Sequence, residues 1–252
     1  MNDWLDDLRT AVAFLTRLPM PHPQGAAPQN FVRAHRMFPV VGAAIGGAVG
    51  LLCLALRAIG LPDLAAAALA LGASALLTGA LHEDGLADVA DGFGGGRVSA
   101  AKLEIMRDSR LGTYGALILM VGFVAKLSAL AALPDGVVVQ GLIAAHALAR
   151  GALPFMAMSL PYARKDGLAA NAGRPESATA MTAGAFALLI ALLALPWREA
   201  LGAALVAAAC AIGMAWLAQR QIGGQTGDVL GGAEQLGETA ILLLLAARGI
   251  RP

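Results

Sequence analysis

Residues 37–60 read MFPVVGAAIGGAVGLLCLALRAIG, and this apolar stretch sets the class of protein to which the chain belongs. About 20 apolar residues are enough for a helix to cross the hydrocarbon core of a bilayer. Within the stretch, Gly42, Gly46 and Gly50 form two overlapping GxxxG motifs. Such motifs let two helices approach closely in lipid. The stretch therefore predicts a transmembrane helix that packs tightly against a neighbour.

Apolar stretches of similar length recur along the chain. The 252 residues are 58% hydrophobic and only 14% charged, whereas a soluble domain carries about 25% charged residues. The predicted spans are Met37–Gly60, Pro62–Leu81, Thr113–Leu133, Gly136–Leu160, Thr179–Trp197, Glu199–Gln219 and Thr226–Ala247. We therefore expect an all-α fold in which residues 1–252 form one integral membrane domain, a polytopic bundle of about seven transmembrane helices.

The N-terminal segment, residues 1–36, has a different pattern. Trp4, Leu8 and Leu15 recur at helical spacing, with charged residues between them. This pattern predicts an amphipathic helix that lies in the membrane interface. The net charge of +1 and the lack of a basic run give no indication of a nucleic-acid partner.

Lysine and arginine are concentrated in alternate segments between the spans. The first segment carries Arg9, Arg17, Arg33 and Arg36, the loop after the second span carries Arg97, Lys102, Arg107 and Arg110, and the loop after the fourth carries Arg164, Lys165 and Arg174. The loops between them carry only Arg57 and Arg198, although Arg248 and Arg251 run against the pattern. The positive-inside rule then places the N-terminus and the two basic loops in the cytoplasm.

The longest segment between spans, residues 82–112, is acidic and rich in glycine. Asp84, Asp88 and Asp91 are spaced i, i+4 and i+7, so on a helix they would lie within about 60° of one another. Three neighbouring carboxylates repel one another unless a cation neutralises them, and Mg²⁺ takes oxygen ligands that it shares with substrate phosphates. A solvated acidic face is the alternative. The adjoining apolar span and the flanking glycines favour a metal site in this loop.

Further polar residues point to phosphate binding on the same loop. Arg107 and Arg110 flank Asp108, and a guanidinium group can bind a phosphate in a bidentate manner. Both arginines are equally explained as ordinary positive-inside residues. His82 is a candidate contact for phosphate, with a structural role as the alternative.

A second polar cluster falls within the predicted spans. Ionisable residues in lipid are costly, so a functional or paired role is expected for each of them. The residues are Lys126, His146, Arg150, Asp228, Glu234 and Glu238. Pairing with Glu234 or Glu238 is the interpretation for Lys126, whereas the role of Arg150 stays open. The segment GGQTGD, residues 223–228, opens the last span on the same predicted side as the acidic loop, which favours one composite site.

Three motifs together resemble the cobalamin synthase family, the adenosylcobinamide-GDP ribazoletransferases. They are HEDGLADVADGFGGG from His82, RDSRLGTYG from Arg107 and GGQTGD from Gly223. The opening FLTRLPMP and the FPVVGAAIG at the start of the first span are also similar to the family. The resemblance covers nearly the whole chain.

The resemblance implies a magnesium-dependent transferase in the inner membrane of a bacterium. Its substrates would be adenosylcobinamide-GDP and either α-ribazole or α-ribazole 5′-phosphate, with GMP as the leaving group. Asp84 and Asp88 would hold Mg²⁺ against the diphosphate, and Asp91 would complete the metal site or take the hydroxyl proton. The catalytic residues would be Asp88 and Asp91. Substrate-binding candidates are His82, Arg107, Asp108, Arg110, Arg150, Thr226 and Asp228. Nothing in the sequence indicates the oligomeric state.

Other classes of membrane protein fit the sequence less well. A CDP-alcohol phosphotransferase also uses several aspartates, but its motif carries an arginine that is missing after Asp84-Gly85. A polyprenyl transferase would have a second aspartate-rich motif in another helical hairpin, and the sequence lacks one. A secondary transporter would carry its charged site near the midplane of the membrane, and often internal repeats.

Overall fold

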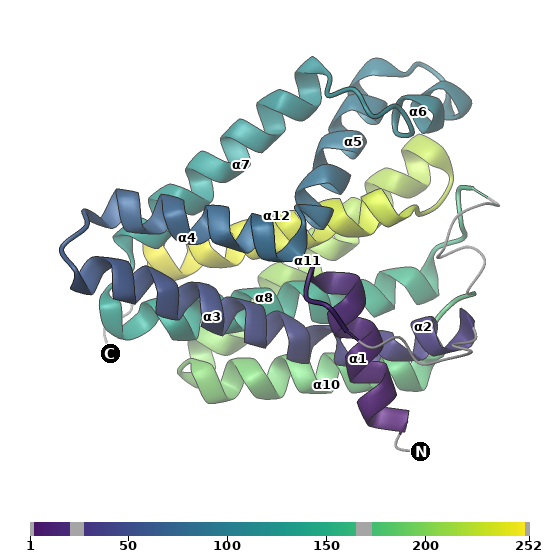
Figure 1. Ribbon diagram of the computed structural model, residues 1–252. Coiled ribbons are helices and arrows are strands. Elements are labelled where there is room, and N and C mark those ends of the chain that lie inside the picture. The colour runs from purple at the N-terminus through teal and green to yellow at the C-terminus, as the bar shows by residue number, and fades with distance from the viewer. Residues whose placement is uncertain (1–2, 21–27, 165–172, 250–252) are drawn as a thin grey trace.

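The computed structural model describes residues 3–20, 28–164 and 173–249, and these residues form a bundle of α-helices without a named strand (Figure 1). The long helices are α3 (Phe38–Ala58), α4 (Asp63–Thr78), α7 (Thr113–Ala132), α8 (Asp135–Ser159), α10 (Ser177–Ala194), α11 (Trp197–Ile222) and α12 (Gly227–Ala247). Shorter helices are α1 (Asp3–Leu15), α2 (Pro28–Ala34), the 3-10 turn η1 (His35–Met37), α5 (Leu81–Gly95) and α6 (Ser99–Ile105). The predicted all-α class is confirmed.

The predicted number of spans agrees with the helices. Six helices in the described residues are long and apolar enough to cross a membrane, and the number is seven if α4 and α5 together count as one bent span. The chain is therefore a multi-pass membrane protein. The first span can begin as early as Asn30, because α2 and η1 lead directly into α3. The boundary of the N-terminal segment that we expected at residue 36 thus falls inside a continuous helical stretch.

The acidic segment expected to be a loop is mostly a helix. It forms α5, which turns away from α4 by 90°. The turn is made by Gly79 and Ala80, which adopt left-handed backbone angles with φ of 68° and 54°. The backbone of Arg17 donates a hydrogen bond of 2.7 Å to the Leu77 carbonyl at the end of α4, so the N-terminal segment covers this corner.

The glycines of the first span form its contact with α8, as the GxxxG pattern predicted. A Cβ atom added at Gly42 would lie 2.5 Å from the carbonyl oxygen of His146, and one added at Gly50 would lie 2.8 Å from the Cα of Val139. No side chain separates the two backbones at these points, and α3 and α8 run side by side (Figure 1). This close approach places α8, and with it His146 and Arg150, in the interior.

The predicted N-terminal helix is present as α1, which runs across the directions of α3 and α10 (Figure 1). Its Asp7 is fully buried and pairs with Arg33 at 2.9 Å and Arg36 at 2.7 Å. These two ion pairs attach α1 to the helices that precede α3.

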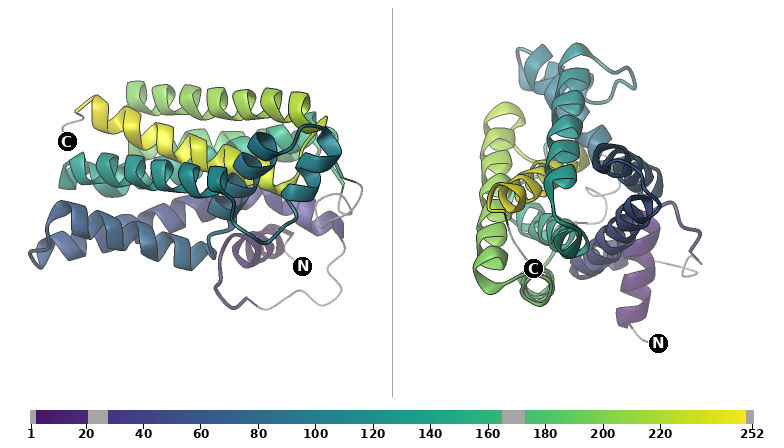
Figure 2. Two further views of the ribbon diagram at one scale, coloured as in Figure 1. Left: turned by 90° about the horizontal axis from the view of Figure 1, so that it is seen from above. Right: turned by 90° about the vertical axis from the view of Figure 1, so that its left-hand side faces the viewer.

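The segments that carry most of the basic residues meet at one end of the bundle. The hydroxyl of Ser99 donates to the carbonyl of Ile222 at 3.3 Å, and the backbone of Ala163 donates to Gln225 at 2.9 Å. Figure 2 shows α5 and α6 at this end and the C-terminal end of α12 at the other. The single-sided arrangement of the acidic segment and GGQTGD is therefore confirmed, while Lys165 and Arg251 lie outside the described residues.

Candidate active site

The two motifs that the sequence analysis assigned to one site lie in contact. Helix α5 packs on the first turns of α12, and a Cβ atom added at Gly85 would lie 2.9 Å from the carbonyl oxygen of Asp228. Asp84 and Asp88 are on α5, so this contact brings them beside Asp228 although the two helices are far apart in the sequence. The result is a group of carboxylates at one end of the bundle.

Asp228 is held in place by two neighbours. Its Oδ2 atom pairs with Arg164 at 2.8 Å and accepts a hydrogen bond from the Thr226 hydroxyl at 3.1 Å. The same hydroxyl oxygen accepts a hydrogen bond from the backbone of Val229, so Thr226 is the N-cap of α12. Thr226, expected to bind substrate, thus also has a structural role next to Asp228.

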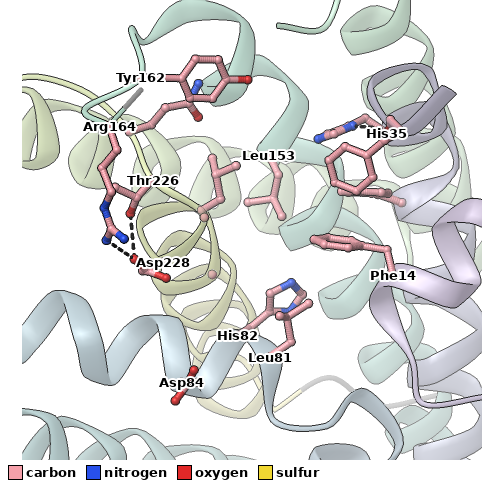
Figure 3. A pocket seen from close by; sticks show the side chains of 16 residues that line it. Phe14, His35, Leu81, His82, Asp84, Leu153, Tyr162, Arg164, Thr226 and Asp228 are labelled. Carbon is pink, nitrogen blue, oxygen red and sulfur yellow. Dashed lines mark hydrogen bonds and ion pairs between the residues drawn. The ribbon is translucent and has the colours of Figure 1, made fainter. Parts of the chain in front are cut away.

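A cavity of about 280 Å³ opens beside these residues. Figure 3 shows Arg164, Thr226 and Asp228 on one side, with Asp84 below them, and Phe14 and His35 on the opposite side. Leu81, His82 and Leu153 lie between the two sides (Figure 3). The cavity therefore has a charged end and an aromatic end.

The carboxylates at the charged end are the oxygen donors that could hold a cation. Asp84 is exposed and Asp88 is half-buried. Asp84, Asp91 and Asp228 all lie close enough to Asp88 to repel its charge, and Arg164 partly offsets them. Carboxylate oxygens without enough positive charge around them are suitable ligands for a hard cation. The donors present at this end therefore fit Mg²⁺.

A more compact group of possible metal ligands lies inside the bundle. The ligand atoms of His146, Glu234 and Glu238 all lie within 4.8 Å of one another, and no other described residues, including the aspartates, form such a group. The buried group already has positive partners, since Arg150 pairs with Glu234 at 2.5 Å and Lys126 with Glu238 at 3.1 Å. We therefore interpret it as an ion-pair network that needs no metal.

The buried network connects three helices to α5. The predicted pairing of Lys126 is confirmed, because its ammonium group lies 3.1 Å from Glu238, and it also donates to Gln235 at 2.6 Å. His82, at the start of α5, has its Nδ1 atom 3.2 Å from Glu234. Arg150, whose role the sequence left open, is 1% exposed and serves this network. Of the two network residues that were predicted to bind substrate, His82 and Arg150, only His82 also lines the cavity.

Asp91 has a different environment from the other two aspartates of its helix. It is buried, and its two carboxylate oxygens accept hydrogen bonds of 2.8 Å from the backbone of Gly112 and Gly115. These bonds hold the start of α7 against α5. Asp91 therefore serves as an anchor between the two helices, which is a role that the sequence analysis did not consider.

The arginines predicted to clamp phosphate lie away from the cavity. Arg110 makes hydrogen bonds to both oxygens of Asp108, and these bonds hold the pKa of the Asp108 carboxyl at about 2. Asp108, Arg110 and Arg107 are not among the described residues that line the cavity. Arg164 instead contacts the carboxylates at the charged end of the cavity, through its ion pair with Asp228.

Two features of the cavity were missed by the sequence analysis. Arg164 was counted only as a positive-inside residue, although its place after the fourth span put it on the same side as GGQTGD. The rings of Phe14, Phe31 and Phe38 were not noticed. Phe31 and Phe38 are seven residues apart, which places them on one face of a helix, whereas Phe14 joins them only in the folded chain.

Comparisons with known proteins give one consistent result. The family model described as cobalamin-5-phosphate synthase matches residues 7–246. The chain is similar to the adenosylcobinamide-GDP ribazoletransferase of Bradyrhizobium diazoefficiens, with 47% identity over 96% of this chain and 93% of the relative. It is also similar to the proteins of that name from a Sinorhizobium species, with 45% identity over 98% of both chains, and from Azorhizobium caulinodans, with 43% identity over 95% and 94%. No solved structure matches the chain.

Proposed function

The chain belongs to the cobalamin-5-phosphate synthase family, and we propose that the charged end of its cavity is where the reaction of this family takes place. The reaction is a transfer that joins adenosylcobinamide-GDP to ribazole, and the enzyme is a multi-pass membrane protein. The observation that carries the location is the contact of α5 with α12, which brings Asp84 and Asp88 beside Asp228.

The bonds that change are phosphorus–oxygen bonds. A ribose hydroxyl of α-ribazole, or of its 5′-phosphate, attacks the phosphorus atom that carries the cobinamide arm. The bond from that phosphorus to the GMP oxygen breaks, and GMP leaves with the electron pair. In phosphoryl transfer a protein mainly positions the groups and neutralises their charge. The cavity offers both functions, with Arg164 for the anionic substrate and carboxylates for a cation.

Of the carboxylates at this end, those of Asp84 and Asp228 would hold Mg²⁺, and Asp88 lies beside them. When bound, the ion supplies positive charge to the diphosphate oxygens. The three aspartates lie near one another without enough positive charge, which is the environment that a cation would complete. Asp91 contributes by holding α5 against α7, since both of its oxygens already accept backbone hydrogen bonds.

The proton of the attacking hydroxyl needs an acceptor, and we assign this role to Asp88. Its neighbours Asp84, Asp91 and Asp228 are carboxylates. In such a group one member readily holds a proton, because the others repel its negative charge. Asp88 is also half-buried, which keeps bulk water from competing for the same proton.

Arg164 is the residue best placed to bind the diphosphate. It lines the cavity next to Asp84 and Asp228 and is partly exposed. Its guanidinium group already pairs with Asp228, so Asp228 and the phosphate would share it.

The site lies at the end of the bundle where the basic segments gather, and this position indicates which side of the membrane the site faces. We place the site on the cytoplasmic face of a bacterial inner membrane.

The test is transfer by the purified protein in lipid nanodiscs. Adenosylcobinamide-GDP and α-ribazole would be supplied over a range of Mg²⁺ concentrations, and GMP release would be measured. We expect no release without Mg²⁺. Asp84→Asn, Asp88→Asn and Asp228→Asn should each lose most of the activity, and high Mg²⁺ should partly restore Asp84→Asn and Asp228→Asn. Glu104→Gln is the matched control, since Glu104 is an exposed carboxylate near the same end but outside the cavity. Full activity in all three aspartate variants would contradict the proposal.

A further inference from the structure

Aromatic residues are scarce in this chain, yet four rings gather at one place. Phenylalanine, tryptophan and tyrosine make up 5% of the residues. The rings of Phe14 and Phe31 meet edge to face with their centroids 4.8 Å apart, and His35 stacks on Phe38 at 4.4 Å. Phe14 also stacks on Phe38 at 5.8 Å. We call these four residues the aromatic cluster.

The aromatic cluster forms the end of the cavity opposite the carboxylates. Phe31, His35 and Phe38 recur at helical spacing along the continuous stretch of α2, η1 and α3, and Phe14 of α1 packs against them. All four line the cavity, and Figure 3 shows Phe14 and His35 across from Arg164 and Asp228. Phe38 is almost fully buried, whereas Phe14 and Phe31 keep part of their surface accessible. An occupant can therefore touch the rings of Phe14 and Phe31.

The two ends of the cavity call for a ligand with two different parts. The charged end suits a ribose or phosphate group that reacts beside Asp84 and Asp228. The aromatic end suits a flat apolar ring system, because offset and edge-to-face packing of aromatic rings is favourable. A base joined to a ribose has this form, and the planar base would pack against the accessible surface of Phe14 and Phe31 while the ribose points toward the carboxylates.

We propose that the aromatic cluster binds the base of the ribazole acceptor. This inference rests on the proposed function, because ribazole is the acceptor only if the chain catalyses the transfer described above. Ribazole is a ribosylated benzimidazole, whose bicyclic base is planar and has few polar atoms on its edge. Stacking of the base would then orient the ribose hydroxyl toward the phosphorus atom, and the cluster would determine which acceptor is used.

The polarity of the cluster distinguishes the acceptor base from the guanine of the other substrate. A guanine edge has several hydrogen-bond donors and acceptors, and burying them without partners is costly. His35 is the one polar side chain among the four, and its Nδ1 atom already bonds the Phe31 carbonyl at 3.0 Å. Of the neighbours toward the middle of the cavity, Leu81 and Leu153 are apolar, and the Nδ1 atom of His82 already lies 3.2 Å from Glu234 (Figure 3). This end therefore fits the less polar base.

The experiment measures KM separately for the two substrates in Phe14→Leu and Phe31→Leu. Leucine keeps the sites apolar and removes the flat ring, so we expect KM for α-ribazole to rise by about tenfold, the size of a lost base–ring stack. KM for adenosylcobinamide-GDP should stay within about twofold of the wild-type value. Phe31→Tyr, which keeps the ring, should retain most of the wild-type affinity for α-ribazole. The control is Phe123→Leu, because Phe123 is an exposed residue of α7 outside the cavity.

A second acceptor separates the possible outcomes. A purine riboside has a more polar edge, so the wild-type protein should prefer α-ribazole, and Phe31→Leu should reduce that preference. Unchanged KM for α-ribazole in both leucine variants, with active wild-type protein, would overturn the aromatic site alone. A rise in KM for adenosylcobinamide-GDP instead would assign the cluster to the guanine and also overturn it. Absence of any transfer by the wild-type protein would mean that the proposed function itself has failed.

Discussion

The backbone of Asp228 lies directly against Gly85, and this contact joins the two halves of the candidate site. The two helices can lie this close only with glycine at position 85, because any larger side chain there would meet the carbonyl of Asp228. The position of Asp84 and Asp88 relative to Asp228 therefore depends on the absence of a Cβ atom at Gly85.

The first prediction is that Gly85→Ala separates α5 from α12 and inactivates the protein. The new Cβ atom would lie 2.9 Å from the Asp228 carbonyl oxygen, so one helix has to move. We expect the rate of GMP release to fall at least tenfold while the protein still inserts and purifies normally. Gly72→Ala is the control, because Gly72 lies in α4 with no neighbouring atom within 4 Å of the added Cβ. That variant should keep its activity, and an active Gly85→Ala would contradict the role of the contact.

The second prediction concerns Asp91, whose two oxygens accept hydrogen bonds from Gly112 and Gly115. Asp91→Asn replaces one acceptor with an amide donor, which faces a backbone N–H group and cannot bond it. We expect a loss of roughly 1–3 kcal/mol in the free energy of unfolding. The loss of activity should not be reversed by high Mg²⁺, in contrast to Asp84→Asn.

The measurement for Asp91 is a denaturant titration alongside the transfer assay. Reduced stability together with activity that Mg²⁺ does not restore would match an anchoring role. Normal stability with activity restored by Mg²⁺ would instead assign Asp91 to the metal, as the spacing of the three aspartates alone suggests.

The limits of prediction from the sequence are clear in α5. Hydropathy placed the spans within a few residues, as with Thr113–Leu133 and the observed α7, because apolar length is a local property. The 90° turn between α4 and α5 was not predicted, since it needs a left-handed backbone at Ala80, a residue type that gives no such signal. The roles of Asp91 and Arg164 depend on partners that only the tertiary structure brings near.

The third prediction concerns the side of the membrane. In a background with Cys53→Ala and Cys210→Ala, single cysteines would be placed by Ser99→Cys, Ser177→Cys and Arg198→Cys. Ser99 and Ser177 begin helices at the end of the bundle that carries the site, whereas Arg198 lies in the first turn of α11 at the other end. An impermeant thiol reagent applied to spheroplasts should label only the cysteine at position 198. Labelling at position 177 before lysis would place the site outside the cytoplasm.

The fourth prediction compares two arginines. Arg164→Lys should reduce activity strongly, because lysine keeps the charge but cannot bridge Asp228 and a phosphate with a planar fork. Arg110→Lys should have the smaller effect, since Arg110 is exposed and bonded to Asp108. The comparison is made with kcat/KM for adenosylcobinamide-GDP in both variants. The reverse order would return the phosphate clamp to Arg107 and Arg110, as the sequence motif had indicated.

The last prediction concerns the buried ion pair of Lys126 and Glu238, which are 3.1 Å apart and almost fully buried. Removal of one partner takes away the closest opposite charge of the other, and breaking a buried ion pair in this way costs roughly 3–5 kcal/mol in a protein interior. Lys126→Met and Glu238→Gln should therefore each lower the free energy of unfolding by such an amount. The double variant should lose less than the sum of the two, because both charges of the pair are then gone.

Equilibrium unfolding in mixed micelles measures the stability of all three variants. Lys102→Met is the control, since Lys102 bonds the neutral Gln221 outside the core. Additive losses in the double variant would show that Lys126 and Glu238 do not act as a pair, and that Arg150 compensates Glu238 without Lys126.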